Sequence, residues 1–348
     1  MKCPNCGAEV SETAKFCPSC GFRLEQAGTR IEHLRSRQIV EALIPPAPAR
    51  GVPMPPPSNS LIPNLRAMFN AVFKPRAPLS LGPMPSLSHK TADVAYIIAI
   101  AVLLGIGLAV AYGMVRVGSL FTLAFFLSLI PTGAYLSLVY LSDRFEREPP
   151  LLVALAFAWG AASTLPALLV NNAAARAIGI LAPVVSAPIG EEFFKSIFVY
   201  YMFTRSKLST EVNSLTDGFV YGFASGLGFG FVENIVYMAS ITLTSSMIDA
   251  VVIRSLTVLM HGFTTGIVGW WLAYMKLRGV PYAGRMWDLA SPLVFAICVH
   301  AVWNGTSTLL QLLGARTAPL AVMTLYFVGI AYLIRKIIGE AIRDEVLK

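Results

Sequence analysis

Beyond about residue 93, long apolar runs alternate with short polar turns along the chain. These runs are 20 or more residues long and carry almost no charge. A helix needs roughly 20 apolar residues to cross a bilayer, and ordinary buried helices are shorter than that. We therefore predict an all-α polytopic membrane protein with about eight transmembrane helices. The predicted spans are 94–115, 120–141, 151–170, 177–203, 218–240, 251–275, 289–312 and 317–338.

The first 92 residues have a different composition. Residues 25–92 hold 12 of the 23 prolines, which predicts a mostly extended linker. Within it, residues 61–73 gather apolar side chains near one face, with basic residues close by. This pattern fits either a helix on the inner membrane surface or a simple linker helix. The predicted organisation is a ribbon at 1–24, a linker at 25–92 and a transmembrane domain at 93–340.

Four of the five cysteines lie close together at the N-terminus. Cys3, Cys6, Cys17 and Cys20 form two C-x2-C pairs separated by ten residues. Two such pairs place four thiolates around Zn²⁺, and the metal supplies folding energy that so short a segment lacks. We predict a small zinc ribbon whose zinc is structural, because four cysteines leave no open coordination position. Its cytoplasmic partner is unknown.

The net charge of +8 at first suggests a nucleic-acid partner. The predicted spans instead place 22 of the 27 Lys and Arg residues on one side of the membrane and four on the other. Basic residues concentrate on the cytoplasmic side of membrane proteins. The chain has no recognisable N-terminal signal peptide. We expect a multi-pass protein of the cell membrane with both termini in the cytoplasm, and no nucleic-acid partner.

Ionisable side chains inside the predicted spans are concentrated in four consecutive helices. Such groups are costly in a bilayer, so each is a candidate for function. The candidates are Glu191, Glu192 and Lys195 in the fourth span, Glu233 and Tyr237 in the fifth, His261 in the sixth, and His300 and Asn304 in the seventh.

The helical spacing of these residues predicts their neighbours. Lys195 can pair with either adjacent glutamate along its helix. A helix that starts near Pro188 would place its positive dipole end beside both carboxylates. Glycines at every fourth position from Gly218 to Gly230 form a smooth stripe that favours close helix packing. Glu233 lies on the same face as the stripe, so we predict that it points into the bundle.

Each polar residue alone has a simpler structural interpretation. A buried His or Asn is often an interhelical hydrogen-bond partner, and a Glu–Lys pair is often a structural salt bridge. The whole set in four consecutive spans favours an active site or a transport site.

Known catalytic patterns narrow the chemistry. The H-E-x-x-H pattern of metalloproteases is absent from the sequence, as is a serine in G-x-S-G spacing. Every Asp beyond residue 90 lies at or outside a span end. A glutamate acting as general base on water, helped by histidine, therefore fits best, with His or Asn binding the oxyanion. No cofactor is expected in this reaction.

At these residues the sequence resembles the PrsW family of membrane proteases, within the superfamily of the type II CAAX prenyl endopeptidases. The resemblance covers roughly residues 120–310 and leaves out the ribbon and linker. The spacing to Lys195 favours the PrsW branch over CAAX processing. The matching motifs are YLSDRFEREPP at 140–150, EEFFK at 191–195, TDGFVYGFASGLGFGFVENIVY at 216–237, RSLTVLMHGFTTG at 254–266 and HAVWN at 300–304.

The resemblance implies a glutamic intramembrane protease that cuts a membrane-anchored protein, such as an anti-sigma factor. It implies that one of Glu191 and Glu192 activates water and that Lys195 is the basic residue following the pair. It also implies that Glu233 and Tyr237 form a second acidic motif. His261 is the implied partner of the catalytic glutamate, and His300 with Asn304 the implied oxyanion-binding pair.

Two other functions stay open at this stage. The same Glu, Lys and His residues would also suit a proton- or ion-coupled transporter, although transporters usually contain internal repeats and we find none. An inactive relative that serves as a membrane scaffold is the other alternative. The sequence does not distinguish Glu191 from Glu192 as the base, and it does not identify the substrate or oligomeric state.

Overall fold

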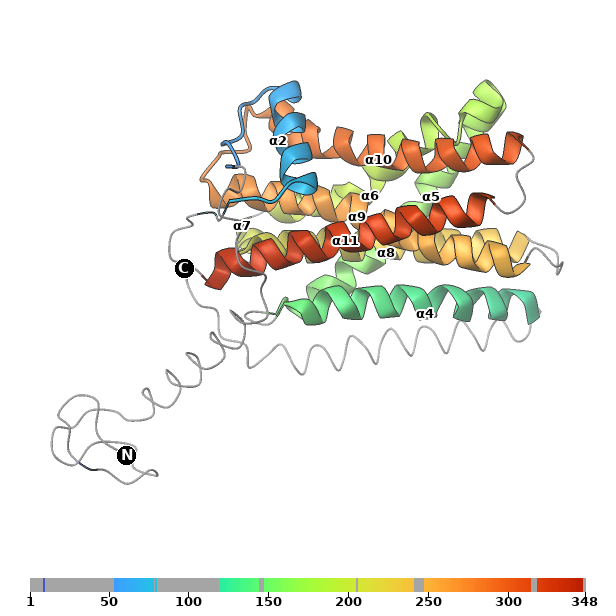
Figure 1. The fold of residues 1–348 in the computed structure, drawn as a ribbon, viewed down its shortest axis with the longest axis horizontal. Helices are drawn as coiled ribbons and strands as arrows, with labels where there is room; N and C mark the ends of the chain where they lie inside the picture. Colours follow the sequence, from blue (N-terminus) through green and yellow to red (C-terminus); the bar gives the residue numbers. More distant parts are fainter. Residues whose placement is uncertain are drawn as a thin grey trace. The chain divides into compact units, whose positions relative to one another are not determined.

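A computed structural model describes residues 9, 53–77, 79, 119–143, 147–204, 206–240, 247–313 and 318–346. The chain divides into two compact units, essentially Met1–Ala49 and Arg50–Val346. The predicted zinc ribbon and the predicted span 94–115 lie outside the described residues. In its described part the second unit contains helices and no strands, as predicted (Figure 1).

Seven long helices lie in the described part of this unit. Their bounds are α4 Ser119–Ser142, α5 Pro150–Ile178, α6 Ser186–Thr204, α8 Leu215–Ser240, α9 Met247–Leu277, α10 Met286–Leu312 and α11 Ala318–Val346. Three shorter elements are α2 Leu61–Phe73, the 3-10 turn η1 Gly179–Leu181 and α7 Ser206–Ser209. Among the described residues, six helices are long and apolar enough to cross a membrane. The exception among the long helices is α6, because Glu191, Glu192 and Lys195 lie within its 19 residues.

The prediction of one continuous span over 177–203 is wrong at its start. Residues 177–178 end α5, and η1 and a turn follow before α6 begins at Ser186. Gly179, the C-cap residue of α5, has a φ of +56° and a ψ of −126°, a combination that glycine adopts without strain because it has no Cβ atom. Pro188 lies in the first turn of α6, where proline costs no intrahelical hydrogen bond. Of the alternatives considered for Pro188, the structure has a helix start, which lies one to two turns before the two glutamates.

The centre of the unit is the pair α8 and α9. α8 also contacts α4 and α5, and α9 also contacts α10 and α11. The glycine stripe of α8 faces α9, as its spacing predicted. A Cβ atom at Gly222 would lie 2.2 Å from the carbonyl oxygen of Thr265, and one at Gly226 would lie 2.0 Å from that of His261. The two backbones approach so closely only because these positions have no side chain.

Part of the predicted linker packs against the bundle. The helix predicted at 61–73 is present as α2, which contacts α10 and α11. Asn64 donates a 2.5 Å hydrogen bond to Asp288 at the start of α10. The buried Arg76 forms a 2.6 Å ion pair with Asp344 at the end of α11. Residues 53–77 thus belong to the folded unit, which the interpretation as an extended linker did not anticipate.

Candidate active site

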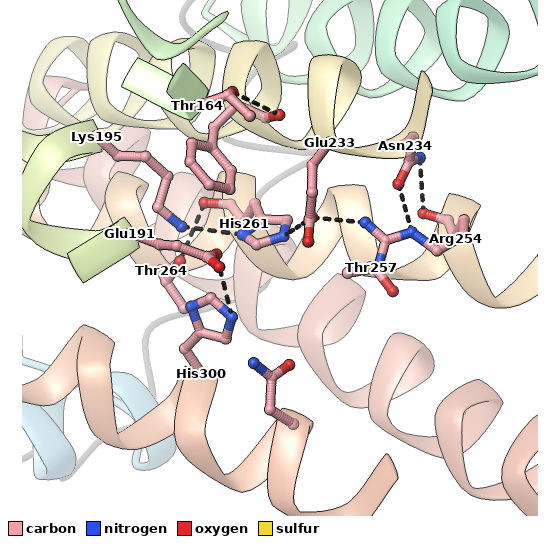
Figure 2. A network of polar contacts seen from close by, with 12 residues as sticks. Thr164, Glu191, Lys195, Glu233, Asn234, Arg254, Thr257, His261, Thr264 and His300 are labelled. Carbon is pink, nitrogen blue, oxygen red and sulfur yellow. Dashed lines mark hydrogen bonds and ion pairs between the residues drawn. The ribbon is translucent and has the colours of Figure 1, made fainter. Parts of the chain in front are cut away.

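Six of the eight predicted site residues lie together in the space between α6, α8, α9 and α10 (Figure 2). This group is almost fully enclosed. Its most buried members are exposed by at most 3%: Glu191, Glu192, Lys195, His261 and His300. Buried ionisable groups must be paired and hydrogen-bonded to be tolerated. The partners of each side chain therefore indicate its role.

Glu192 is the most heavily bonded carboxylate of the group. Its Oε1 atom accepts from the Lys195 ammonium at 2.6 Å, from His300 Nδ1 at 2.8 Å and from the Thr264 hydroxyl at 3.0 Å. Its Oε2 atom is 3.4 Å from the Thr265 hydroxyl. A carboxylate with this many donors is held in one orientation and stabilised in its charged form.

Glu191 is placed differently, although it is the next residue along the same helix. Its Oε1 atom accepts one hydrogen bond, 2.8 Å from Asn171 on α5. Its Oε2 atom is buried and has no hydrogen-bond partner among the described residues. That atom lies 3.7 Å from Nε2 of His300. Glu191 therefore has a buried acceptor directed at a histidine and not yet used.

His300 lies between the two glutamates. Its Nδ1 atom contacts the charged Glu192, so we assign the ring proton to Nδ1. Nε2 then has a lone pair directed toward Glu191. Two unused acceptors 3.7 Å apart can both receive hydrogen bonds from a single water molecule.

His261 connects Lys195 to a third glutamate, Glu233. Its Nδ1 atom lies 2.9 Å from the Lys195 ammonium, and its Nε2 atom lies 2.9 Å from Glu233. Since an ammonium only donates, Nδ1 accepts and Nε2 carries the ring proton. Arg254 on α9 donates to Glu233 at 2.5 Å and to Asn234 at 2.7 Å. Figure 2 shows this continuous series from Arg254 through Glu233 and His261 to Lys195.

Two predicted site residues lie outside the hydrogen-bonded group. Asn304 donates its amide to the carbonyl oxygen of Pro183 at 2.8 Å, so that amide is engaged outside the group. Tyr237 is 53% exposed, and its ring stacks on the Arg254 guanidinium at 4.4 Å. The sequence analysis in turn missed Asn171 and Arg254 as partners of the glutamates. Each is a polar residue at the end of an apolar run, and this position is the signal in the sequence by which both could have been found.

The donor types also allow a metal ion to be considered. Glu191, His261 and His300 each offer a ligand atom, and these atoms lie within 4.8 Å of one another. Two histidines and a carboxylate with one open position form a common zinc-hydrolase set. The unpartnered Glu191 Oε2 fits this set. His261 fits only if it releases Lys195 or Glu233, because both ring nitrogens have partners.

Comparisons with known proteins agree with the motifs. The family model described as PrsW family intramembrane metalloprotease matches residues 148–333. A zinc-ribbon model matches residues 2–24, which include the four clustered cysteines. The term metalloprotease differs from our expectation of a reaction without a cofactor, so the metal alternative is considered below.

Two relatives resemble the transmembrane part. Protease PrsW of Geobacillus kaustophilus is 32% identical over 178 residues, which is 50% of this chain and 75% of the relative. Protease PrsW of Oceanobacillus iheyensis is 28% identical over 181 residues, which is 51% of this chain and 79% of the relative. No solved structure matches the chain.

Proposed function

This chain belongs to the PrsW family of intramembrane proteases, and from that premise we propose that it is an endopeptidase in which Glu191 activates water. The observation that carries the proposal is the unequal bonding of the two glutamates. Glu192 is saturated with donors, whereas Glu191 has a buried Oε2 without a partner, 3.7 Å from His300 Nε2. A general base needs a free acceptor within reach of the proton that it removes.

The proposed reaction starts from a water bonded to both Glu191 Oε2 and His300 Nε2. Glu191 removes one proton from the water, and the water oxygen attacks the carbonyl carbon of the scissile bond. The tetrahedral intermediate then collapses. Its C–N bond breaks, and the proton held by Glu191 passes to the leaving nitrogen. Glu192 keeps His300 oriented through Nδ1, as the carboxylate of a catalytic triad does.

The remaining predicted residues have supporting roles in this proposal. Lys195 neutralises Glu192, and Glu233 with Arg254 fixes the ring of His261. The oxyanion role predicted for Asn304 requires its amide to leave the Pro183 carbonyl when substrate binds. Tyr237 stacks on Arg254 and acts through it.

The substrate class follows from the setting. The group lies among helices apolar enough to span a bilayer, so the proposed substrate is a membrane-anchored protein, of which an anti-sigma-type regulator is the expected example. Near the end of α11, three basic residues, Lys336, Arg343 and Arg76, lie with two acidic ones, Glu340 and Asp344. This small excess of basic residues supports the proposal that both termini face the cytoplasm.

The test compares new protein N-termini in membranes of cells that lack the gene and carry either wild type or one variant. We expect cleavage products with wild type and with Glu211→Gln, a control outside the group, and none with Glu191→Gln. Thermal unfolding of purified Glu191→Gln should match wild type, because this glutamate accepts one hydrogen bond that glutamine retains. Products that persist with Glu191→Gln would disprove its role. Absence of any wild-type product would favour the inactive scaffold.

The second candidate is metal-assisted hydrolysis at Glu191, His261 and His300, favoured by their spacing. A zinc ion there would bind the water and lower its pKa toward neutrality. The zinc content of the purified protein distinguishes the two candidates, provided that the zinc site of the ribbon is first removed by mutation. A Cys17→Ser/Cys20→Ser variant that still holds one zinc per chain, lost on adding His300→Ala, would establish the metal candidate. A zinc-free but active variant would reject it.

A further inference from the structure

A second buried polar cluster lies at the other end of α8 from Glu233. Asp143 follows the end of α4, Glu148 precedes α5, and Asp217 lies in the first turn of α8. One oxygen from each carboxylate lies within 4.8 Å of the other two, and the residues are exposed by 2%, 2% and 1%. Asp217 and Glu233 are 16 residues apart, about 24 Å along a helix. This acidic cluster is therefore separate from the proposed active site.

Capping explains one of the three carboxylates. Asp217 accepts hydrogen bonds from the backbone amides of Asn213 and Ser214 and from the Ser214 hydroxyl. In return, the Ser214 hydroxyl accepts from the Asp217 amide at 3.1 Å. This is a capping box, which satisfies the free amides at the start of α8. It accounts for Asp217, but it does not account for Glu148.

The cluster concentrates negative charge without a matching cation at Glu148. In the part of the chain that the structure describes, neither Glu148 nor Asp217 forms an ion pair with Lys or Arg. Lys276 interacts electrostatically with Asp217, but its ammonium donates hydrogen bonds to the carbonyl oxygens of Ser209 and Val212. Burial, and then the charge of Asp217, raise the pKa of Glu148 well above its ordinary value. Charged carboxylates buried together require a proton or a cation between them.

An incomplete set of polar contacts points to a ligand. Glu148 Oε2 is buried and makes no hydrogen bond in the described part of the chain. The hydroxyl of Tyr221, one turn along α8 from Asp217, is buried too. It interacts with the Glu148 carboxylate, but no described residue bonds it in good hydrogen-bond geometry. Native structures rarely leave such atoms unsatisfied, so each needs an explanation. A bound ion would use both oxygens.

We propose that Asp143, Glu148 and Asp217 bind a hard divalent cation of the Mg²⁺ and Ca²⁺ class, with the Tyr221 hydroxyl beside it. Carboxylate oxygens are the preferred ligands of these ions, whereas zinc and copper prefer histidine and cysteine. The ion would connect the junction between α4 and α5 to the start of α8. This inference does not depend on the proposed proteolytic mechanism.

The test measures Mn²⁺ binding to the purified full-length chain in detergent by electron paramagnetic resonance, with zinc already loaded on the ribbon. We expect a site from which Mg²⁺ or Ca²⁺ displaces Mn²⁺. Glu148→Gln should weaken its affinity by at least about tenfold, since even outer partners of metal ligands contribute 10–100-fold. Glu191→Gln, at a buried glutamate outside the cluster, should keep the affinity unchanged, which separates this site from the active site.

Thermal unfolding gives a second measurement of ion binding, which remains informative if Glu148→Gln folds poorly. Wild type should gain thermal stability on adding Mg²⁺ or Ca²⁺, and Tyr221→Phe should gain less, because it keeps the ring and loses only the hydroxyl. Wild type that binds no Mn²⁺ at millimolar concentration would overturn the proposal and leave a proton on Glu148. Binding that Glu148→Gln leaves intact would overturn it as well.

Discussion

The close contact between α8 and α9 makes a sharp prediction about Gly226. A Cβ atom at this position would lie 2.0 Å from the carbonyl oxygen of His261 and 2.8 Å from the Cα of Gly262. Real Cβ contacts stay beyond 3.0 Å, so Gly226→Ala must move α9 away by at least 1.0 Å. Both atoms to be moved belong to backbone, which cannot rotate out of the way. Overpacking of this kind typically costs about 1–3 kcal/mol.

The displacement bears directly on the candidate active site. His261 holds Glu233 on α8 at 2.9 Å, and a hydrogen bond weakens once its heavy atoms separate beyond about 3.2 Å. A shift of 1.0 Å at His261 would therefore break this contact. We expect Gly226→Ala to lower the unfolding temperature by about 2–12 °C, at about 2–4 °C per kcal/mol for a unit of this size. Cleavage should also be lost.

The assay combines thermal unfolding in detergent with the count of new N-termini in membranes. Gly329→Ala is the matched control, because it makes the same substitution inside α11 where a Cβ atom would meet nothing within 4 Å. Alanine also favours helix over glycine by about 1 kcal/mol, so this control should be as stable as wild type or more stable. Equal unfolding temperatures for Gly226→Ala and wild type, or equal losses in both variants, would refute the reasoning.

Four further predictions follow from single contacts. Lys195→Met should cost about 3–5 kcal/mol in unfolding free energy, because it leaves Glu192 buried without its 2.6 Å partner; stability equal to wild type would contradict this. Arg254→Lys should lower cleavage about 10–100-fold with little change in unfolding temperature, since lysine cannot bond Glu233 and Asn234 in the same geometry; unchanged cleavage would remove Arg254 from the site. Ser214→Ala should cost about 1 kcal/mol through loss of the α8 cap, whereas Ser142→Ala, at an exposed helical hydroxyl, should cost less. Burial raises the pKa of Glu148, so ionising this carboxyl group costs free energy in the folded protein. The free energy of unfolding, measured with a chelator present, should therefore fall as the pH rises above 4.5, the ordinary pKa of a glutamate. Glu148→Gln or added Mg²⁺ should make this dependence on pH weaker.

Most of the helical architecture could be predicted from the sequence because membrane helices have a strong signal. Apolar runs of sufficient length predicted α4, α5, α8, α9, α10 and α11, and the four-residue glycine repeat predicted which face of α8 packs closely. The break between α5 and α6 was harder to place. It depends on the positive φ of Gly179. A single glycine inside an apolar run does not predict that backbone conformation, because glycine also occurs within helices.

The membership of the site was more predictable than the roles within it. Ionisable side chains are costly in a bilayer, and this cost identified Glu191, Glu192, Lys195 and both histidines as candidates. The difference between the two adjacent glutamates depends on donors from α5, α9 and α10, and no local pattern contains that information. Asp143 and Asp217 were set aside as residues at span ends. Their convergence with Glu148 requires the ends of three separate segments to meet in space.

The polarity of α6 has a consequence for how the protein is made. The translocon releases a segment into lipid according to its hydrophobicity, and each charged residue near the centre of a helix opposes release by about 2.5–3.5 kcal/mol. With Glu191, Glu192 and Lys195 in 19 residues, α6 is poorly suited to enter lipid alone. Glu192 can pair with Lys195 within α6, and Glu191 with Asn171 on the earlier helix α5. The other partners of these charges lie on α9 and α10, which are synthesised later. A nascent chain would thus carry its two glutamates with incomplete contacts until synthesis is nearly complete. The group would therefore be complete only after the ribosome has synthesised α9 and α10.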